Sequence, residues 1–323
     1  MTLRQIHKSF VTGHTSLIVV VFLFILFRFI GANEGDSAVV LWSTAAVQLA
    51  TAFLLLYLTQ TFVIIRNRTF LSAFFYLLFT GTIPDLYGDL SGSFSGICLL
   101  FCNFFLFASY QQERSQAHAL NIALFLTIGS FLWAPLLYFF PLFWFGMYQL
   151  RSLNFRSFVA SLLGFVVVYL FVFTWNFHQG TQATFLQENP DWQALLHINP
   201  LDFDLLEYLI IGFLAMLFFL SGGNIFVASI SEKIKTIIAL RFLYIACVFV
   251  FILLLLQNDW KKEWFSILCI PLSLLVTHLF ALTEKTVIRW LMLATILFFL
   301  VMFILFQLEM EFDQSIRLMI NLP

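Results

Sequence analysis

Long apolar runs separated by short polar breaks recur along the whole chain. A helix needs roughly 20 apolar residues to cross a hydrocarbon core of about 30 Å. The pattern therefore predicts an all-α fold, a polytopic transmembrane helix bundle with about 11 spans in a single integral membrane domain, residues 1–323. The expected spans are 15–31, 38–64, 70–83, 93–110, 118–132, 135–150, 157–176, 205–221, 242–257, 264–282 and 290–307.

Two breaks inside apolar runs bear on how often the chain crosses. Residues 119–150 contain Trp133-Ala134-Pro135 and are flanked by Arg114 and Arg151, which both favour the cytoplasm. An even number of passes is required, so this stretch is either two short spans or a re-entrant hairpin. Ser221-Gly222-Gly223 is expected to break a helix on the cytoplasmic side.

The longest polar interruption, 177–204, is predicted to be an extracytoplasmic segment with a short interfacial helix. Asn189-Pro190-Asp191 has the residue types of a helix start, with a cap, a proline at the first position and an acid in the first turn. Trp192, Leu195 and Leu196 follow on one face. This arrangement suits a helix lying at headgroup depth.

Composition agrees with the apolar pattern. Apolar residues make up 62% of the chain and charged residues 10%, with a mean hydropathy of +0.97, which a soluble domain with a polar surface does not have. No basic block suggests nucleic-acid binding. The four cysteines lack the spacing of a metal or disulfide site and are interpreted as packed free thiols.

The charges sort by side of the membrane. With the N-terminus cytoplasmic and the C-terminus extracytoplasmic, only three of the seventeen acids (Glu113, Glu232, Glu284) lie inside. Cytoplasmic loops of inner-membrane proteins carry an excess of Lys and Arg. Twelve of the sixteen cations fall there: Arg4, Lys8, Arg66, Arg68, Arg114, Arg151, Arg156, Lys233, Lys235, Arg241, Lys285 and Arg289. We therefore expect a multi-pass protein of the bacterial inner (plasma) membrane whose candidate chemistry lies at the outer face.

Arg28 is the one cation inside a predicted span. It lies five residues before Asn33, roughly 7 Å below the outer loop at 1.5 Å per residue. Its side chain is expected to snorkel to the interface or to pair with Glu34 or Asp36. The functional alternative is that Arg28 binds the phosphate of a lipid-linked substrate.

Four acids follow the first and third spans on the outer side: Glu34, Asp36, Asp85 and Asp89. Carboxylates at a membrane surface can hold a divalent cation, or one of them can act as a general base toward a sugar hydroxyl. Isolated loop acids are more often simply solvated. The metal, if one is used, is not identified by these residues.

His178 and His197 flank the outer segment and are candidates for proton transfer or substrate binding. No acid lies deep in a predicted span, which a coupled transporter usually needs. His278 lies inside a span and is expected to hydrogen-bond a neighbouring helix.

The run from Arg66 to Phe165 carries a resemblance. Its features are Arg66-Asn67-Arg68-Thr69-Phe70, a short span, Pro84-Asp85 with a Gly/Ser turn, Tyr110-Gln111-Gln112-Glu113-Arg114 and the Trp133-Pro135 hairpin ending at Arg151. It resembles an uncharacterised family of multi-pass inner-membrane proteins of Bacteroidota. Its layout is distantly similar to the polytopic C-superfamily glycosyltransferases, which transfer a sugar from a polyprenyl-phosphate donor at the outer face. That resemblance implies Glu34 or Asp36 as the base and Arg28 as a phosphate contact.

The sequence leaves open whether the protein is an enzyme. A glycosyltransferase-like protein acting on polyprenyl-phosphate-linked sugars is the first hypothesis. Such an enzyme would need a divalent cation or Arg28 to offset the acidic outer face. A non-enzymatic membrane subunit of an envelope assembly or secretion complex is the second, and a small-molecule or lipid transporter the third. Donor, acceptor, partner proteins and oligomeric state are not specified by the residues.

Overall fold

The computed structural model describes residues 15–31, 37–66, 69–179, 203–228, 233–282 and 286–320. This part of the chain is helical and holds no β-strand. Its helices are α2 (Thr15–Ile30), α3 (Ala38–Thr61), α4 (Leu71–Thr82), η1 (Pro84–Leu86), α5 (Leu90–Ala108), α6 (Gln116–Ser130), η2 (Ala134–Tyr138), α7 (Phe139–Gln149), α8 (Phe155–Gln179), α11 (Leu205–Ala228), α12 (Ile234–Leu256), η3 (Asn258–Trp260), α13 (Lys261–Leu282) and α14 (Thr286–Ile320).

Each of the eleven expected apolar runs forms an α-helix within the described residues. Seven of these, α3, α5, α8, α11, α12, α13 and α14, are long and apolar enough to cross a membrane. The shorter apolar helices α2 and α4 lie among them. The chain is therefore a multi-pass helical membrane protein in a lipid bilayer.

Two helices form the centre of the bundle. Every residue of α4 is buried, and α4 packs against α2, α3, α13 and α14. The helix α13 is buried on all sides and packs against α4, α5, α11 and α12. Hydroxyl side chains are tolerated there because they bond within the helix: Ser273 donates to the Ile270 carbonyl and Thr277 to the Ser273 carbonyl.

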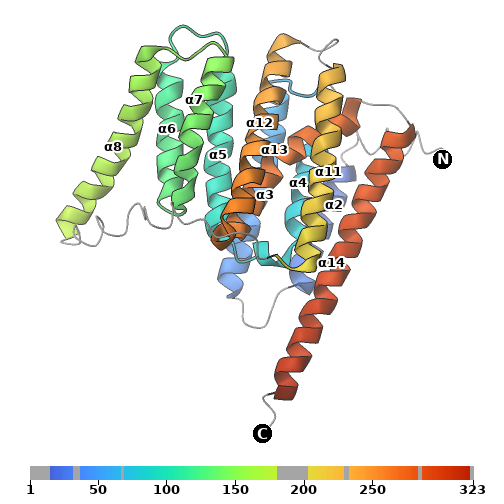
Figure 1. Ribbon diagram of the computed structural model, residues 1–323. Helices are drawn as coiled ribbons and strands as arrows, with labels where there is room; N and C mark the ends of the chain where they lie inside the picture. Colours follow the sequence, from blue (N-terminus) through green and yellow to red (C-terminus); the bar gives the residue numbers. More distant parts are fainter. Residues whose placement is uncertain are drawn as a thin grey trace.

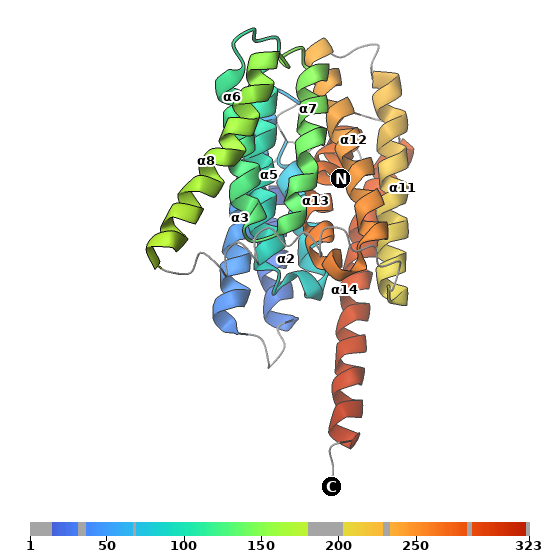
Figure 2. The ribbon, with the colours of Figure 1, turned by 60° about the vertical axis from the view of Figure 1, so that its left-hand side comes forward.

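The helices α8 and α14 lie at opposite edges (Figure 1). Most of α8 faces outward and it packs chiefly on α6, with Phe155, Phe171 and Phe177 exposed. Aromatic and aliphatic side chains on such a face suit lipid. The 35 residues of α14 span about 52 Å at 1.5 Å per residue, more than the hydrocarbon core requires. Figure 2 shows its C-terminal end projecting beyond the other helices.

The helix connections gather at the two ends of the bundle, drawn at the top and bottom of Figure 1. We call the upper one the basic end, because its described residues include Arg66, Arg114, Arg151, Arg156, Lys233 and Lys235. The lower one is the acidic end, because its connections carry Asp85, Asp89, Asp204, Glu207, Asp259 and Glu263 together with Lys261 and Lys262.

The stretch between Arg114 and Arg151 forms two helices rather than one. The helix α6 ends at Ser130, Trp133 is extended with φ −150°, and η2 leads into α7. The Gln111 amide donates to the Leu150 carbonyl at 3.0 Å, so both ends of this hairpin lie at the basic end. The predicted break at Trp133-Ala134-Pro135 is thus confirmed, with one short helix on either side of it.

One expected break is wrong. Ser221, Gly222 and Gly223 lie inside α11, which continues to Ala228. A Cβ on Gly222 would lie 2.6 Å from the ring of Tyr244 on α12, so this glycine allows close helix packing instead of ending the helix.

Candidate functional site

Arg28 is the only cation in the described part of α2, and it points into the protein. Its side chain is fully buried. Nη1 donates to the Leu41 carbonyl at 3.1 Å, to Thr44 Oγ1 at 3.0 Å and to the Tyr87 carbonyl at 3.1 Å. Nη2 donates to Gln48 Oε1 at 2.6 Å. The guanidinium does not snorkel to the interface, because these acceptors replace water inside the bundle.

The acceptors around Arg28 are all neutral. No described carboxylate lies within ion-pair distance of it, and its Nε has no acceptor among the described residues. Aromatic faces contribute instead: its guanidinium carbon lies 4.4 Å from the ring centroid of Tyr87 and 5.2 Å from that of Phe24. Cation–π attraction is strongest where water is excluded.

Tyr87 connects this site to the turn between α4 and α5. Its hydroxyl donates to the Gly81 carbonyl at 2.6 Å, and its carbonyl accepts from Arg28 and Thr44. Burial raises the pKa of this phenol well above its ordinary value, so it stays a donor at physiological pH. A Cβ on Gly31 would lie 2.8 Å from both the Tyr87 ring and Gln307 Nε2, so only glycine fits there.

A hydrogen-bond chain continues from Arg28 toward α5. Gln48, on α3, accepts from Arg28 and donates through Nε2 to Ser93 Oγ at 3.1 Å. Thr44 and Gln48 lie four residues apart and therefore share the face of α3 that meets Tyr87. This series of hydrogen bonds links α2, α3 and α5 at one level near the acidic end.

Asp89 caps one helix and bonds to another. As the N-cap of α5 it accepts from the Gly92 amide at 2.7 Å, and its other oxygen accepts from Ser266 Oγ on α13 at 2.7 Å. Ser91 Oγ lies 3.1 Å from oxygens of both Asp89 and Glu263. This carboxylate therefore joins α5 to α13 and is 94% buried.

Asp85 lies at a small cleft of about 10 Å³, room for about one water molecule, between η1, α11, α13 and α14. Its carboxylate is 3.7 Å from Lys262, and Lys261 pairs with Glu207 at 2.8 Å. Apolar side chains, Phe265 and Phe306 among them, form the rest of the lining. Two ammonium groups and two carboxylates thus surround an apolar floor at the acidic end.

The other predicted site residues are dispersed. Glu34, Asp36 and His197 lie outside the described residues, as does most of the segment 177–204 with its expected interfacial helix. His178 is exposed near the far end of α8. Arg28 contacts Tyr87, and Asp85 and Asp89 lie two residues before and after Tyr87 in the same turn, without a contact to Arg28.

Sequence reasoning missed Tyr87, Gln48 and the Lys261–Glu207 pair. Two signals were present in the sequence: the lysine pair Lys261-Lys262 just before a long apolar run, and the polar Gln48 inside another apolar run.

For a divalent cation, the described residues contain no group of three or more His, Cys, Asp or Glu side chains able to hold a metal. Asp85 and Glu207 remain the carboxylates at the cleft.

His278 is buried in α13, and its Nδ1 lies 3.5 Å from Asn224 Nδ2 on α11, as expected for a residue that bonds a neighbouring helix.

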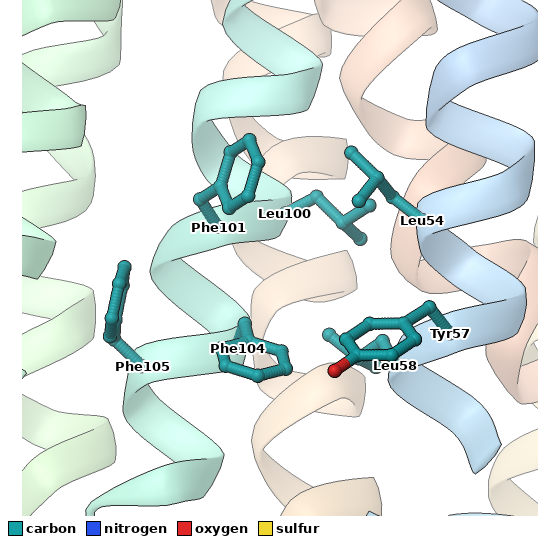
Figure 3. A pocket seen from close by; sticks show the side chains of 7 residues that line it. All are labelled: Leu54, Tyr57, Leu58, Leu100, Phe101, Phe104 and Phe105. Atoms are coloured by element: carbon teal, nitrogen blue, oxygen red, sulfur yellow. The ribbon is translucent and has the colours of Figure 1, made fainter. Parts of the chain in front are cut away.

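On the lipid-facing side, an apolar groove of about 130 Å³ runs between α3 and α5 (Figure 3). Leu54, Tyr57, Phe101 and Phe104 line it. Such a groove accommodates hydrocarbon, with no polar group except the Tyr57 hydroxyl.

No family model, curated protein or solved structure matches this chain.

Proposed function

We propose that the protein is a bacterial inner-membrane protein with eleven crossings, its N-terminus cytoplasmic and its C-terminus extracytoplasmic. The support is the separation of charge: the basic end carries the connections rich in Arg and Lys, and the acidic end carries the carboxylates. The positive-inside rule then assigns the basic end to the cytoplasm. Four of the crossings are helices shorter than a full span, and they pack within the bundle.

Its function in this proposal is glycosyltransferase-like, on polyprenyl-phosphate-linked sugars at the outer face of the cell envelope. The observation that carries it is the cleft at the acidic end. Lys261 and Lys262 offer ammonium groups to a phosphate, and Asp85 and Glu207 offer carboxylates to a sugar hydroxyl.

Within this proposal Arg28 positions the site rather than contacting the phosphate. Its Nη1 and Nη2 groups donate to protein acceptors, among them the carbonyl of Tyr87, two residues after Asp85. Glu34 and Asp36 follow α2 directly in the sequence and are the proposed bases. A divalent cation is part of the same hypothesis, because it would offset repulsion between acids and phosphate.

The alternative is a non-enzymatic membrane subunit of an envelope assembly or secretion complex. One observation favours it: the charges at the cleft already pair with each other, and Asp89 is occupied as a helix cap. A transporter of small molecules or lipids is the third hypothesis, for which the buried His278 beside Asn224 is the supporting feature.

The test is mass spectrometry of lipids that co-purify with the protein. Wild type is compared with Lys262→Ala and Asp85→Ala, since both side chains are half exposed and removing them leaves the core intact. Lys233→Ala, an exposed lysine at the basic end, is the matched control. Polyprenyl-phosphate species retained by wild type and the control but lost in the two cleft variants would support the proposal. Phospholipids alone, unchanged by the substitutions, would reject it in favour of the subunit.

A further inference from the structure

At the basic end, two helix connections are joined through one serine. Ser115, after α5, and Ser157, at the start of α8, both donate through Oγ to the carbonyl of Ser152, at 2.5 and 3.4 Å. Ser109 Oγ lies 2.9 Å from Ser152 Oγ. All four serines are fully buried. The α5–α6 and α7–α8 connections therefore form a single unit, which Figure 1 shows at the upper end of the bundle.

Each of three serines in this unit follows an arginine in the sequence. The pairs are Arg114-Ser115, Arg151-Ser152 and Arg156-Ser157. The serines converge on Ser152, whereas the three arginines are exposed. We call the three arginines, on their common backbone support, the arginine platform.

The backbone of the platform is held in a conformation that L-residues rarely adopt. Gln111 has φ 56° and Arg151 has φ 54°, both in the left-handed region. The Gln111 amide donates to the Leu150 carbonyl at 3.0 Å, and Asn154 Nδ2 donates to the Glu113 carbonyl at 2.8 Å. At Arg151 this conformation ends α7, because the Arg151 amide donates to the Tyr148 carbonyl at 3.1 Å and the Ser152 amide to the Met147 carbonyl at 2.9 Å, a common helix C-terminal motif.

The charges of the platform are not balanced within the described residues. Neither a hydrogen bond nor an ion pair engages the side chains of Arg114, Arg151 and Arg156 there. Glu113 is the one acid on the two connections. Three guanidinium groups against one carboxylate leave a net positive surface.

Exposed aromatic side chains lie beside the platform. Phe155, directly before Arg156, is 82% exposed, and Tyr148, three residues before Arg151, is also exposed. Aromatic side chains gather where hydrocarbon meets headgroups, and cations flank them on the aqueous side. This combination is typical of a surface at the depth of lipid phosphates.

From this we propose that the arginine platform binds the phosphodiester headgroup of anionic phospholipids in the adjacent leaflet. A guanidinium presents paired donors that match two phosphate oxygens, and basic surfaces between transmembrane helices recognise anionic headgroups. The rigid support lowers the entropy lost on binding, because the backbone is already ordered. This site is at the opposite end from the cleft of the proposed function and does not depend on it.

The experiment reconstitutes the protein in nanodiscs of phosphatidylcholine mixed with phosphatidylglycerol and measures by native mass spectrometry which lipid stays bound. The test variant combines Arg114→Gln, Arg151→Gln and Arg156→Gln. The matched control combines Arg66→Gln, Lys233→Gln and Arg241→Gln, which removes the same charge from exposed positions at the same end. Thermal unfolding of both variants checks that they remain folded.

We expect the wild type and the control to retain phosphatidylglycerol in preference to phosphatidylcholine, and the test variant to lose that preference by about tenfold or more. Equal loss in the test variant and the control would overturn the proposal, because it would indicate diffuse charge rather than a site. If the test variant kept its preference for phosphatidylglycerol, the proposal would be overturned as well. Displacement of the lipid by an equal concentration of inorganic phosphate would also contradict it, since the site would then take free phosphate.

Discussion

The guanidinium of Arg28 lies over the ring of Tyr87 at 4.4 Å and also donates to the carbonyl of the same residue at 3.1 Å. The two residues are 59 positions apart. This double contact fixes the turn after α4 against α2, so the cleft at the acidic end depends on a cation that does not face it.

Arg28→Ala is expected to lower the free energy of unfolding by about 2–4 kcal/mol, because buried carbonyls, Thr44 and Gln48 lose a charged donor. The four buried cysteines, Cys98, Cys102, Cys247 and Cys269, react with a thiol dye only on unfolding and so report the melting temperature. Gln48→Ala and the double variant complete a cycle whose coupling we expect to exceed about 0.5 kcal/mol. Additive effects would mean that the 2.6 Å contact contributes nothing.

Asp89→Ala should destabilise the protein by about 1–2 kcal/mol through loss of the α5 cap, with a further loss from Ser266 on α13. Asp85→Ala is the control: its side chain is half exposed, so the change should stay within about 0.5 kcal/mol. The same thiol-dye melt measures both. Equal melting temperatures for the two variants would show that the cap is dispensable.

Gly164→Ala should separate α8 from α6. A Cβ there would lie 2.8 Å from the Leu120 carbonyl oxygen and 2.9 Å from Ala123 Cβ, so we expect a loss of about 1–3 kcal/mol. At Gly212, in α11, a Cβ meets nothing within 4 Å, and Gly212→Ala should stabilise by up to about 1 kcal/mol. We expect the melting temperature to fall for Gly164→Ala and to rise for Gly212→Ala. An unchanged melting temperature for Gly164→Ala would argue against close packing of α8 on α6.

The proposed orientation predicts which side a membrane-impermeant thiol reagent labels. In intact cells with a permeabilised outer membrane, Lys262→Cys should react at once, because this side chain is half exposed at the acidic end. Arg114→Cys should react only after the inner membrane is opened. The native cysteines are buried and give no background. Reversed labelling would invert the topology and move the cleft to the cytoplasm.

Apolar run length predicted where each helix lies, because the length of a run is a local property. It did not predict which helices are enclosed. The runs that form α8 and α13 look alike by hydropathy, yet α13 is buried and α8 faces outward. Their polar content does not distinguish them either, because each helix holds two Ser, one Thr and one His. The number of crossings and the orientation stay predictions.

The candidate site was predicted less completely. Arg28 was singled out as an unusual cation, but three of its partners are backbone or hydroxyl acceptors that carry no sequence signature. Lys261 and Glu207 are 54 residues apart, and their pairing depends on the packing of α11 against α13. The glycine pair in α11 predicts a break that the structure does not have, because a single sequence does not show the Tyr244 ring that approaches Gly222.

The enclosure of α4 also constrains how the chain is made. With 12 residues, about 18 Å at 1.5 Å per residue, α4 is too short to cross the bilayer unaided. Part of its cover is α13, which leaves the ribosome almost two hundred residues later. Insertion and folding therefore cannot proceed strictly in order. Until the last quarter of the chain is synthesised, α4 is an incomplete segment in the membrane, and chains truncated before Lys261 should be substrates for membrane quality-control proteases.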